Sequence, residues 1–192
     1  MLIAIEGIDQ SGKKTQTDLL LKRLIASNHS AIKFSFPNYE TPVGKLIEEI
    51  LLNKISVPLE VKHMLLSANR WELKSKIEEY MKKNYIIIFD RYYQSNLAYG
   101  AANGLPLDWL KNLDKNLPEC DLTIILDIPP EVSFRRKVLN RDVHEKDLSY
   151  LSRVRQCFLK LAYENSWIII DGDRPVQEVH ESIWSIVLEK LK

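Results

Sequence analysis

Residues 2–15 read LIAIEGIDQSGKKT, and this stretch decides the fold. Its apolar start is typical of a strand, and a helix-like pattern begins directly after Gly12. Gly7 and Gly12 allow the backbone between these elements to turn tightly, so that successive N–H groups can converge on one anion. Strand, glycine-rich turn and helix start together predict a phosphate-binding P-loop, in which Lys13 reaches the outer phosphates of a nucleoside triphosphate.

One position departs from the P-loop pattern. Lys14 stands where a Ser or Thr normally offers its hydroxyl group to Mg²⁺. A glycine-rich turn between a strand and a helix can also be purely structural. The function of the turn therefore depends on which residues the rest of the chain places beside it.

The bulk composition narrows the class of protein. We expect residues 1–192 to form a single domain. Because 27 Lys and Arg oppose 26 Asp and Glu, the net charge of +1 gives no support for a nucleic-acid partner. The two cysteines and four histidines form no metal-binding pattern. The apolar runs are too short to span a membrane, and Met1 leads straight into the first strand, so we expect a cytoplasmic protein.

Short apolar runs alternate with longer helical stretches along the chain. The predicted strands are residues 2–6, 31–36, 85–90, 122–127 and 167–171. The predicted helices are residues 13–27, 43–53, 58–83, 93–102, 108–115, 130–140, 146–165 and 175–191. This order predicts an α/β fold, with a parallel sheet of about five strands flanked by helices on both faces. Ligands bind at the carboxyl ends of the strands in such sheets.

Charged and aromatic residues follow the predicted strands. The sequence FPNY at 36–39 follows the second strand, Asp90 and Arg91 follow the third, and Asp127 and Asp171 end the fourth and fifth. Strand ends are also where solvent begins, so Asp127 and Asp171 can have structural or capping roles. That explanation fits Asp90 and Arg91 poorly, because they lie between a buried strand and a further apolar helix.

The predicted helix 58–83 carries apolar residues at helical spacing, which predict its core face. They are Leu59, Leu66, Leu73, Ile77 and Met81. Arg70 lies within one turn of this face and could project toward the sheet edge, although a solvated arginine is the default for a helix. Beside Arg91, it could complete a pair of guanidinium groups that clamps an acceptor phosphate through bidentate hydrogen bonds.

Residues 135–155 are rich in Arg and Lys, mixed with Asp and Glu. Such a segment can be a solvated helical face. It can also be a lid that closes over a triphosphate, supplies arginines to the developing charge and excludes water. The sequence pattern leaves both interpretations open.

Five segments taken together resemble the thymidylate kinase family. They are GIDQSGKKT at 7–15, FPNY at 36–39, SANRWE at 67–72, DRYYQSNLAYG at 90–100 and DGDRP at 171–175. The resemblance covers essentially the whole chain. It implies a P-loop NTPase fold with a short lid at about 136–150, usually as a homodimer. It also implies transfer of the γ-phosphoryl group of ATP to dTMP, giving dTDP for dTTP synthesis, with Mg²⁺ as cofactor.

The resemblance further implies roles for the residues that match the family's motifs. Catalytic roles are implied for Lys13, Asp9, Arg91, Arg136 and Arg141. ATP binding is implied for Gly7, Ile8, Asp9, Gln10, Ser11, Gly12, Lys13, Lys14, Thr15, Arg136, Asp173, Pro175 and Val176. Binding of dTMP is implied for Asp9, Phe36, Pro37, Tyr39, Leu66, Arg70, Arg91, Ser95, Asn96 and Tyr99, where Tyr99 would leave little room for a ribose hydroxyl. Magnesium binding is implied for Asp9, Asp90 and Glu145.

Three positions depart from the family's pattern. Lys14 replaces the hydroxyl that binds Mg²⁺, which implies altered metal coordination and not loss of activity. Gln10 occupies a position where one subgroup has a catalytic arginine, so the lid would have to supply it; the candidates are Arg136, Arg141 and Arg153. Leu66 stands where the family commonly has a phenylalanine that stacks on thymine. Because such stacking contributes about 1–3 kcal/mol per base, the choice between thymine and uracil stays open.

Two other functions compete with this one. The first is a kinase for another acceptor, such as dUMP or a deoxynucleoside. A deoxynucleoside kinase needs a base for the 5′-hydroxyl, commonly a carboxylate after the second strand, where this chain offers only Glu40. The second is a non-catalytic ATP-binding module, which Lys14 suggests.

Overall fold

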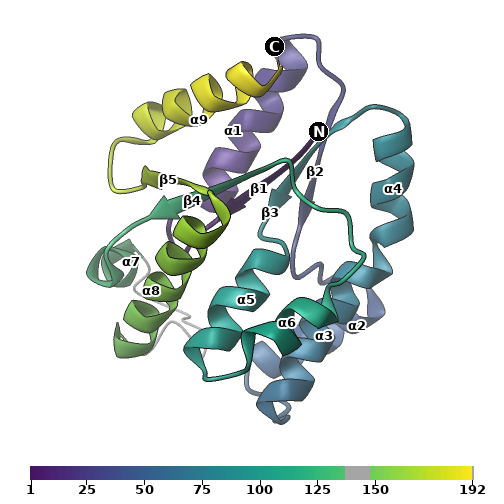
Figure 1. Ribbon diagram of the computed structural model, residues 1–192, viewed down its shortest axis with the longest axis vertical. Helices are drawn as coiled ribbons and strands as arrows, with labels where there is room; N and C mark the ends of the chain where they lie inside the picture. Colours follow the sequence, from purple (N-terminus) through teal and green to yellow (C-terminus); the bar gives the residue numbers. More distant parts are fainter. Residues whose placement is uncertain (137–147, 192) are drawn as a thin grey trace.

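The computed structural model describes residues 1–136 and 148–191. They contain a five-stranded parallel sheet in the order β2-β3-β1-β4-β5 (Figure 1). The strands are β1 (Leu2–Glu6), β2 (Ala31–Ser35), β3 (Ile86–Asp90), β4 (Leu122–Asp127) and β5 (Ile168–Asp171). The prediction of an α/β fold with five parallel strands is confirmed, and the predicted strand bounds differ from those observed by one residue at most.

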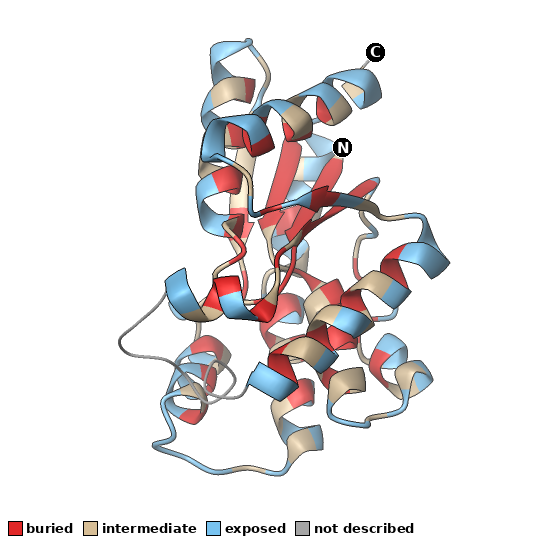
Figure 2. Cartoon of the chain, turned by 90° about the vertical axis from the view of Figure 1, so that its left-hand side faces the viewer, coloured by how far each residue is buried: buried red, intermediate tan, exposed pale blue. Residues whose placement is uncertain are grey.

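The sheet is apolar on both faces, since successive residues of a strand point to opposite sides. In β1, Ile3 and Ile5 pack into one layer, and Leu2 and Ala4 pack into the other. Helices α1 (Lys13–Ala26) and α9 (Val176–Leu191) cover the first face. Helices α4 (Lys74–Lys82), α5 (Tyr93–Ala102) and α8 (Leu148–Asn165) cover the second. Figure 2 shows the buried strands between layers whose exposed residues face outward.

The remaining helices extend the molecule beyond the sheet. They are α2 (Pro42–Leu51), α3 (Leu59–Glu72), α6 (Leu107–Leu113) and α7 (Pro130–Arg136). Helices α2, α3, α5 and α6 gather in the lower right of Figure 1. The segment 58–83, predicted as one helix, consists of two, because Leu73 ends α3 and begins α4.

The predicted core face of this segment is wrong in α3. Of the five apolar residues expected there, only Ile77 of α4 is buried, and Met81 is exposed. Helix α3 instead buries a row of polar residues at helical spacing: His63, Ser67 and Arg70. An apolar pattern locates a core only where the helix packs on apolar neighbours. The buried face of α3 has polar partners instead.

The parallel register brings two loops together at the carboxyl edge of the sheet. Ile5 of β1 pairs with Asp90 of β3, so the segments that leave these strands begin side by side. The P-loop follows β1, and Arg91 follows β3. The fold therefore places Arg91 beside the P-loop, although 84 residues separate Gly7 from Arg91 in the chain.

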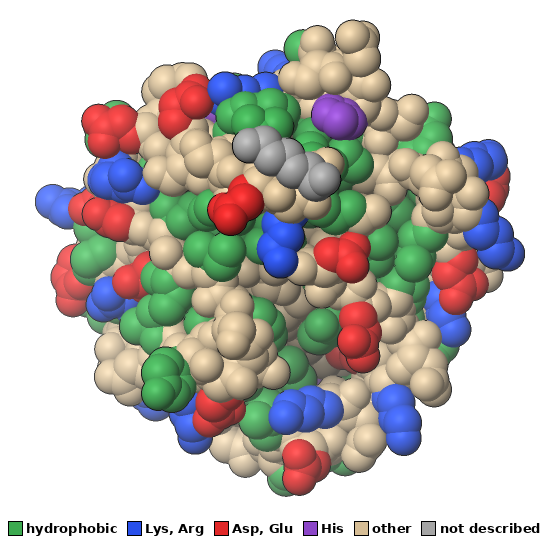
Figure 3. All heavy atoms as spheres, turned by 45° about the horizontal axis from the view of Figure 1, so that its top comes forward, with side chains coloured by type: hydrophobic (Ala, Val, Ile, Leu, Met, Phe, Trp, Pro, Cys, Tyr) green, Lys and Arg blue, Asp and Glu red, His purple; other side chains and the backbone are tan. Residues whose placement is uncertain are grey.

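The surface gives two further observations. In the part of the chain that the structure describes, no helix combines the length and the apolar character needed to cross a membrane. On the face shown in Figure 3, acidic and basic side chains are interspersed. This distribution agrees with the near-zero net charge of +1.

Candidate active site

The turn after β1 has the backbone geometry of an anion-binding loop. Gly7, Gln10 and Gly12 have φ angles of 139°, 61° and 96°. A Cβ atom at Gly7 would lie 2.4 Å from the carbonyl oxygen of Leu126 in β4, so only glycine fits there. Gly12 is the N-cap of α1. The loop therefore directs a helix N-terminus and its free N–H groups at one point, where an anion is favoured.

Lys13 is buried within this loop. Its Nζ donates hydrogen bonds to the carbonyl oxygen of Ile8 at 2.6 Å and to Ser11 Oγ at 3.3 Å. Burial, followed by the charge of Arg91, lowers the pKa of Lys13 to about 8. A bound phosphate would favour the charged ammonium and raise this pKa again.

Glu6 ends β1 and is fully buried, and the sequence patterns did not single it out. Its Oε1 accepts hydrogen bonds from the backbone N–H groups of Tyr92 (2.7 Å) and Ser95 (3.2 Å). Its Oε2 accepts a hydrogen bond from Ser95 Oγ at 2.6 Å. Burial raises the pKa of Glu6, while Arg91 and these donors oppose the shift. The only signal in the sequence is an acidic residue at the end of an otherwise apolar strand.

Arg91 holds the junction between β3 and α5 against the P-loop. Its backbone is in the left-handed region, with φ 66°, which is unusual for a residue other than glycine. Its Nη1 donates to the carbonyl oxygen of Gly7 at 3.2 Å and to Ser95 Oγ at 3.1 Å. Its Nη2 pairs with Asp9 Oδ1. Arg91 thus links the third strand to the P-loop through side-chain contacts.

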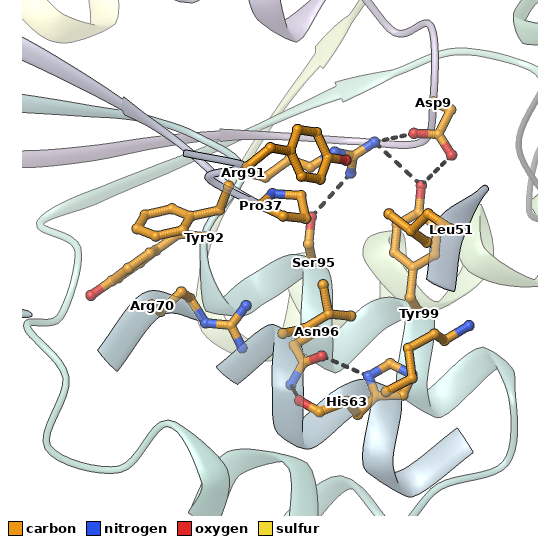
Figure 4. A pocket seen from close by; sticks show the side chains of 14 residues that line it. Asp9, Pro37, Leu51, His63, Arg70, Arg91, Tyr92, Ser95, Asn96 and Tyr99 are labelled. Carbon is orange, nitrogen blue, oxygen red and sulfur yellow. Dashed lines mark hydrogen bonds and ion pairs between the residues drawn. The ribbon is translucent and has the colours of Figure 1, made fainter. Parts of the chain in front are cut away.

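Asp9 joins Arg91 to Tyr99 of α5. The Tyr99 hydroxyl donates to Asp9 Oδ2 at 3.0 Å, and the Arg91 guanidinium lies 5.4 Å from the centre of the Tyr99 ring. Burial raises the pKa of Tyr99 well above its usual value, so the phenol stays neutral and can donate. The result is a network of Asp9, Arg91 and Tyr99, all three of which line a cavity (Figure 4).

This cavity, which we call the central cavity, lies between the P-loop, α3 and α5. Its lining consists of Asp9, Phe36, Pro37, Tyr39, Leu51, Lys62, His63, Leu66, Arg70, Arg91, Tyr92, Ser95, Asn96 and Tyr99. All ten residues expected to bind dTMP are among them. The structure brings these residues together, and their contacts with a ligand stay predictions. Leu51, Lys62, His63 and Tyr92 are lining residues that the sequence analysis did not name.

Arg70 and Arg91 line the same cavity but have different partners. The Arg70 guanidinium forms a bidentate pair with Asp114, with Nε–Oδ1 and Nη2–Oδ2 distances of 3.0 and 2.8 Å. Both side chains of this pair are 3 % exposed. Ser67 Oγ also donates to Asp114 Oδ1, at 2.8 Å. Arg70 is therefore a buried, paired arginine and not a solvated one.

A second group of expected residues lies on the other side of the P-loop. Arg136 of α7 donates to the carbonyl oxygens of Gln10 (3.1 Å) and Gly172 (3.0 Å) and pairs with Asp173 (3.1 Å). Gln16 of α1 donates to the carbonyl oxygen of Val176 at 2.9 Å. These contacts join the P-loop helix to the segment after β5, where ATP binding is expected. Arg141 and Glu145 lie outside the described residues.

The acidic residues that end β4 and β5 accept hydrogen bonds from other residues of the protein. Asp127 accepts from Nε and Nη2 of Arg155 in α8, at 2.7 and 2.8 Å. Asp171 accepts a hydrogen bond from the N–H group of Asp173 at 2.9 Å, which closes the turn after β5.

Within residues 1–136 and 148–191, no group of three or more His, Cys, Asp or Glu residues is arranged to hold a metal ion.

A glycine-rich anion loop on a β2-β3-β1-β4-β5 sheet, with a cavity beside it whose lining includes Asp9, Arg70 and Arg91, defines a P-loop nucleotide kinase. Comparison with known proteins identifies the family. The model of the thymidylate kinase family matches residues 5–183, and the chain belongs to this family.

Individual members of the thymidylate kinase family are similar to this chain over most of its length. The chain is 36% identical to the thymidylate kinase of Schizosaccharomyces pombe, covering 97% of this chain and 90% of that protein. It is 34% identical to the human thymidylate kinase, covering 95% and 87%. The solved structure of thymidylate kinase from Candida albicans superposes with a TM-score of 0.88 at 33% identity, covering 98% of this chain and 91% of that one. Members of this family phosphorylate dTMP to dTDP with ATP.

The lowered pKa of Lys13 predicts a pH dependence of ATP use. Below about pH 8 the ammonium is charged in the free protein, and above it the charge is lost. Because bound phosphates raise this pKa, ATP binding above pH 8 requires uptake of a proton, and affinity falls as the pH rises. We expect kcat/KM for ATP to decline with an apparent pKa near 8, while kcat at saturating ATP lacks this decline. A kcat/KM for ATP that stays constant to about pH 9 would contradict this role of Lys13.

Proposed function

We propose that the chain transfers the γ-phosphoryl group of ATP, bound at the P-loop, to dTMP bound in the central cavity, and so supplies dTDP for dTTP synthesis. The position of Asp9 carries this proposal. Asp9 belongs to the P-loop, lines the central cavity and pairs with Arg91. A phosphate on the loop and a phosphate in the cavity would therefore meet at this pair.

The chemistry requires alignment and charge neutralisation. The bond between the γ-phosphorus and its bridging oxygen breaks, a bond to a dTMP phosphate oxygen forms, and the products are ADP and dTDP. The acceptor oxygen is already ionised at neutral pH, so no side chain has to remove a proton. Lys13 would neutralise the transferring phosphate, and Arg91 would hold the acceptor phosphate in line with it. This agrees with a site in which Lys13 and Arg91 lie close enough to influence each other's charge.

The lining of the cavity supports recognition of a deoxynucleotide. Arg70 and Asn96 are buried polar groups of its lining, against which a base edge would lie. Leu66 supplies apolar contact with the base, and Tyr99 would stand against the sugar. Arg91 contacts the P-loop at Gly7 and Asp9, whereas Arg70 is held by Asp114, so we assign Arg91 to the phosphate and Arg70 to the base edge.

We also propose Mg²⁺ as the cofactor, held by Asp9 and Asp90. Mg²⁺ in such enzymes takes one or two carboxylates together with waters and substrate phosphates. Asp90 ends β3 next to the P-loop, and both carboxylates act electrostatically on Lys13. Both side chains are oxygen donors, and to bind the cation Asp9 would have to share its carboxylate with Arg91 and Tyr99. When bound, Mg²⁺ neutralises charge on the phosphates.

The contacts of Arg136 support a place for it at the ATP site, because it already bridges the P-loop and the segment after β5. Arg153 is directed along α8, with Nη1 3.2 Å from Ser149 Oγ. We therefore assign the catalytic arginine of the lid to Arg136, with Arg141 as the other candidate.

The cysteines support a location for the protein in the cell, and the exposed residues of α3 support an oligomeric state. Cys120 and Cys157 form no disulfide, as is typical of a reducing compartment, and we place the protein in the cytoplasm.

Val61, Met64 and Trp71 are exposed apolar residues on one side of α3, and α2 packs beside α3 and exposes Leu46. We propose that these residues form the interface of a homodimer, since an exposed apolar patch marks an interaction surface.

Removal of either positively charged side chain, Lys13 or Arg91, should abolish most of the activity. We expect Lys13→Ala and Arg91→Ala each to lower kcat/KM by at least about 10²–10³-fold, the usual cost of removing one donor to transition-state charge. Arg23→Ala provides the matched control, because Arg23 pairs with Glu181 between α1 and α9, away from the cavity. Steady-state ADP release, with circular dichroism to verify the fold, measures the effect. A normal rate in either site variant would contradict the proposal.

The dimer proposal predicts the effect of a charge on α3. Light scattering after gel filtration should give about twice the chain mass of 22.4 kDa for the unchanged protein. Met64→Glu should shift the mass toward the monomer, because a charge would be buried in the interface. Ile25→Glu, at an exposed apolar residue of α1, should stay dimeric. A monomeric unchanged protein, or a dimeric Met64→Glu variant, would refute this interface.

A further inference from the structure

His63 and Asn96 form a reciprocal pair of hydrogen bonds in the wall of the central cavity (Figure 4). They come from α3 and α5, and their exposed fractions are 1 % and 2 %. His63 Nδ1 lies 2.6 Å from Asn96 Oδ1, and Asn96 Nδ2 donates to the backbone carbonyl of His63 at 3.3 Å. Gly100 makes room for the imidazole, because a Cβ atom there would lie 3.2 Å from His63 Cε1. The two helices thus approach closely at this pair.

Only one arrangement of protons satisfies both contacts. The backbone carbonyl of His63 can only accept, so the NH₂ group of Asn96 must face it and the Asn96 oxygen must face the ring. That oxygen also can only accept, so the imidazole must carry a proton on Nδ1. The pair therefore fixes both the tautomer of His63 and the orientation of the Asn96 carboxamide.

The surroundings keep His63 neutral in this tautomer. Burial lowers the pKa of His63 to about 4, although the hydrogen bond with Asn96 opposes the shift. With the single proton on Nδ1, Nε2 carries a bare lone pair. This agrees with its surroundings, since Nε2 is buried without a hydrogen-bond partner among the described residues.

A carboxamide of fixed orientation can distinguish pyrimidines. Thymine and uracil present an N3–H donor beside a carbonyl acceptor at C4, whereas cytosine presents an N3 acceptor beside an amino donor. The donor and acceptor positions are thus exchanged between the two kinds of base. An asparagine that can rotate by 180° about its last bond serves both. An asparagine that is held by a neighbour pairs with only one kind of base. Against the other kind, polar groups of the base and the protein stay unpaired, which is an effective way to reject a substrate.

We propose that His63 is a specificity-determining positioning residue, which holds the Asn96 carboxamide in the orientation that accepts a 4-oxo pyrimidine and rejects a 4-amino pyrimidine. This inference rests on the proposed function, because it concerns the acceptor that binds in the central cavity. His63 acts through Asn96 and takes no part in the transfer of the phosphoryl group.

The test compares kcat and KM for dTMP and dCMP in three variants and the unchanged protein. His63→Leu removes the donor at similar volume, and His63→Asn offers a side-chain N–H close to the position of Nδ1. His180→Leu is the matched control, because His180 is also buried and also has a ring nitrogen without a hydrogen-bond partner in the described part of the chain, but lies in α9. We expect His63→Leu to lower the dTMP:dCMP ratio of kcat/KM about fivefold to tenfold, the effect of one hydrogen bond, mainly through KM. His63→Asn should restore most of the ratio, and His180→Leu should leave it unchanged.

An unchanged ratio in His63→Leu, or equal effects of His63→Leu and His63→Asn, would overturn the inference. A nitrogen-15 NMR spectrum of the imidazole groups in the unchanged protein tests it independently of the variants. It should show His63 neutral and protonated at Nδ1 throughout the neutral pH range, and the opposite tautomer would refute the proposed pair. Failure of the unchanged protein to phosphorylate dTMP would instead contradict the proposed function, while the NMR result would still report on the pair.

Discussion

The buried carboxylate of Glu6 is the interaction on which the geometry of the site depends. A carboxyl group buried away from water is costly unless hydrogen-bond partners surround it. Two backbone N–H groups and one hydroxyl group, all from Tyr92 and Ser95, supply these donors and fix the start of α5. Arg91 immediately precedes them in a left-handed conformation that costs on the order of 1–3 kcal/mol. This conformation carries its guanidinium over β1 to Asp9, so one buried carboxylate positions the charged pair where donor and acceptor phosphates are proposed to meet.

The polar side chains of the cavity lining that would face the base are already paired within the protein. Arg70 is neutralised by Asp114, and the carboxamide of Asn96 is fixed by His63. Removing one partner from a buried ion pair costs about 3–5 kcal/mol, because the other charge stays buried. Such pairs therefore hold their side chains in one orientation. A site prepared in this way needs little rearrangement on binding, which is where much of the affinity and alignment of an enzyme originates.

Much of this could be predicted from the sequence. The apolar runs gave the strands to within one residue, and the glycine spacing located the P-loop, because both depend on local backbone properties. The resemblance to a family supplied the ten cavity residues. The polar face of α3 could not be predicted, since periodicity treats only apolar residues as buried. Arg70 depends on Asp114, 44 residues away, and Glu6 looks like an ordinary strand end until its donors from α5 are known.

The most direct test of the account is ADP release by the purified protein with ATP and Mg²⁺, comparing dTMP with dUMP, dCMP, dGMP and the ribose form of TMP. The account predicts rapid turnover with dTMP and at least about tenfold lower kcat/KM for dCMP, dGMP and the ribose nucleotide. The rate with dUMP measures how far Leu66 replaces an aromatic contact with the base. If ATP binds and no acceptor is phosphorylated, the central claim is contradicted, and the chain is an ATP-binding module.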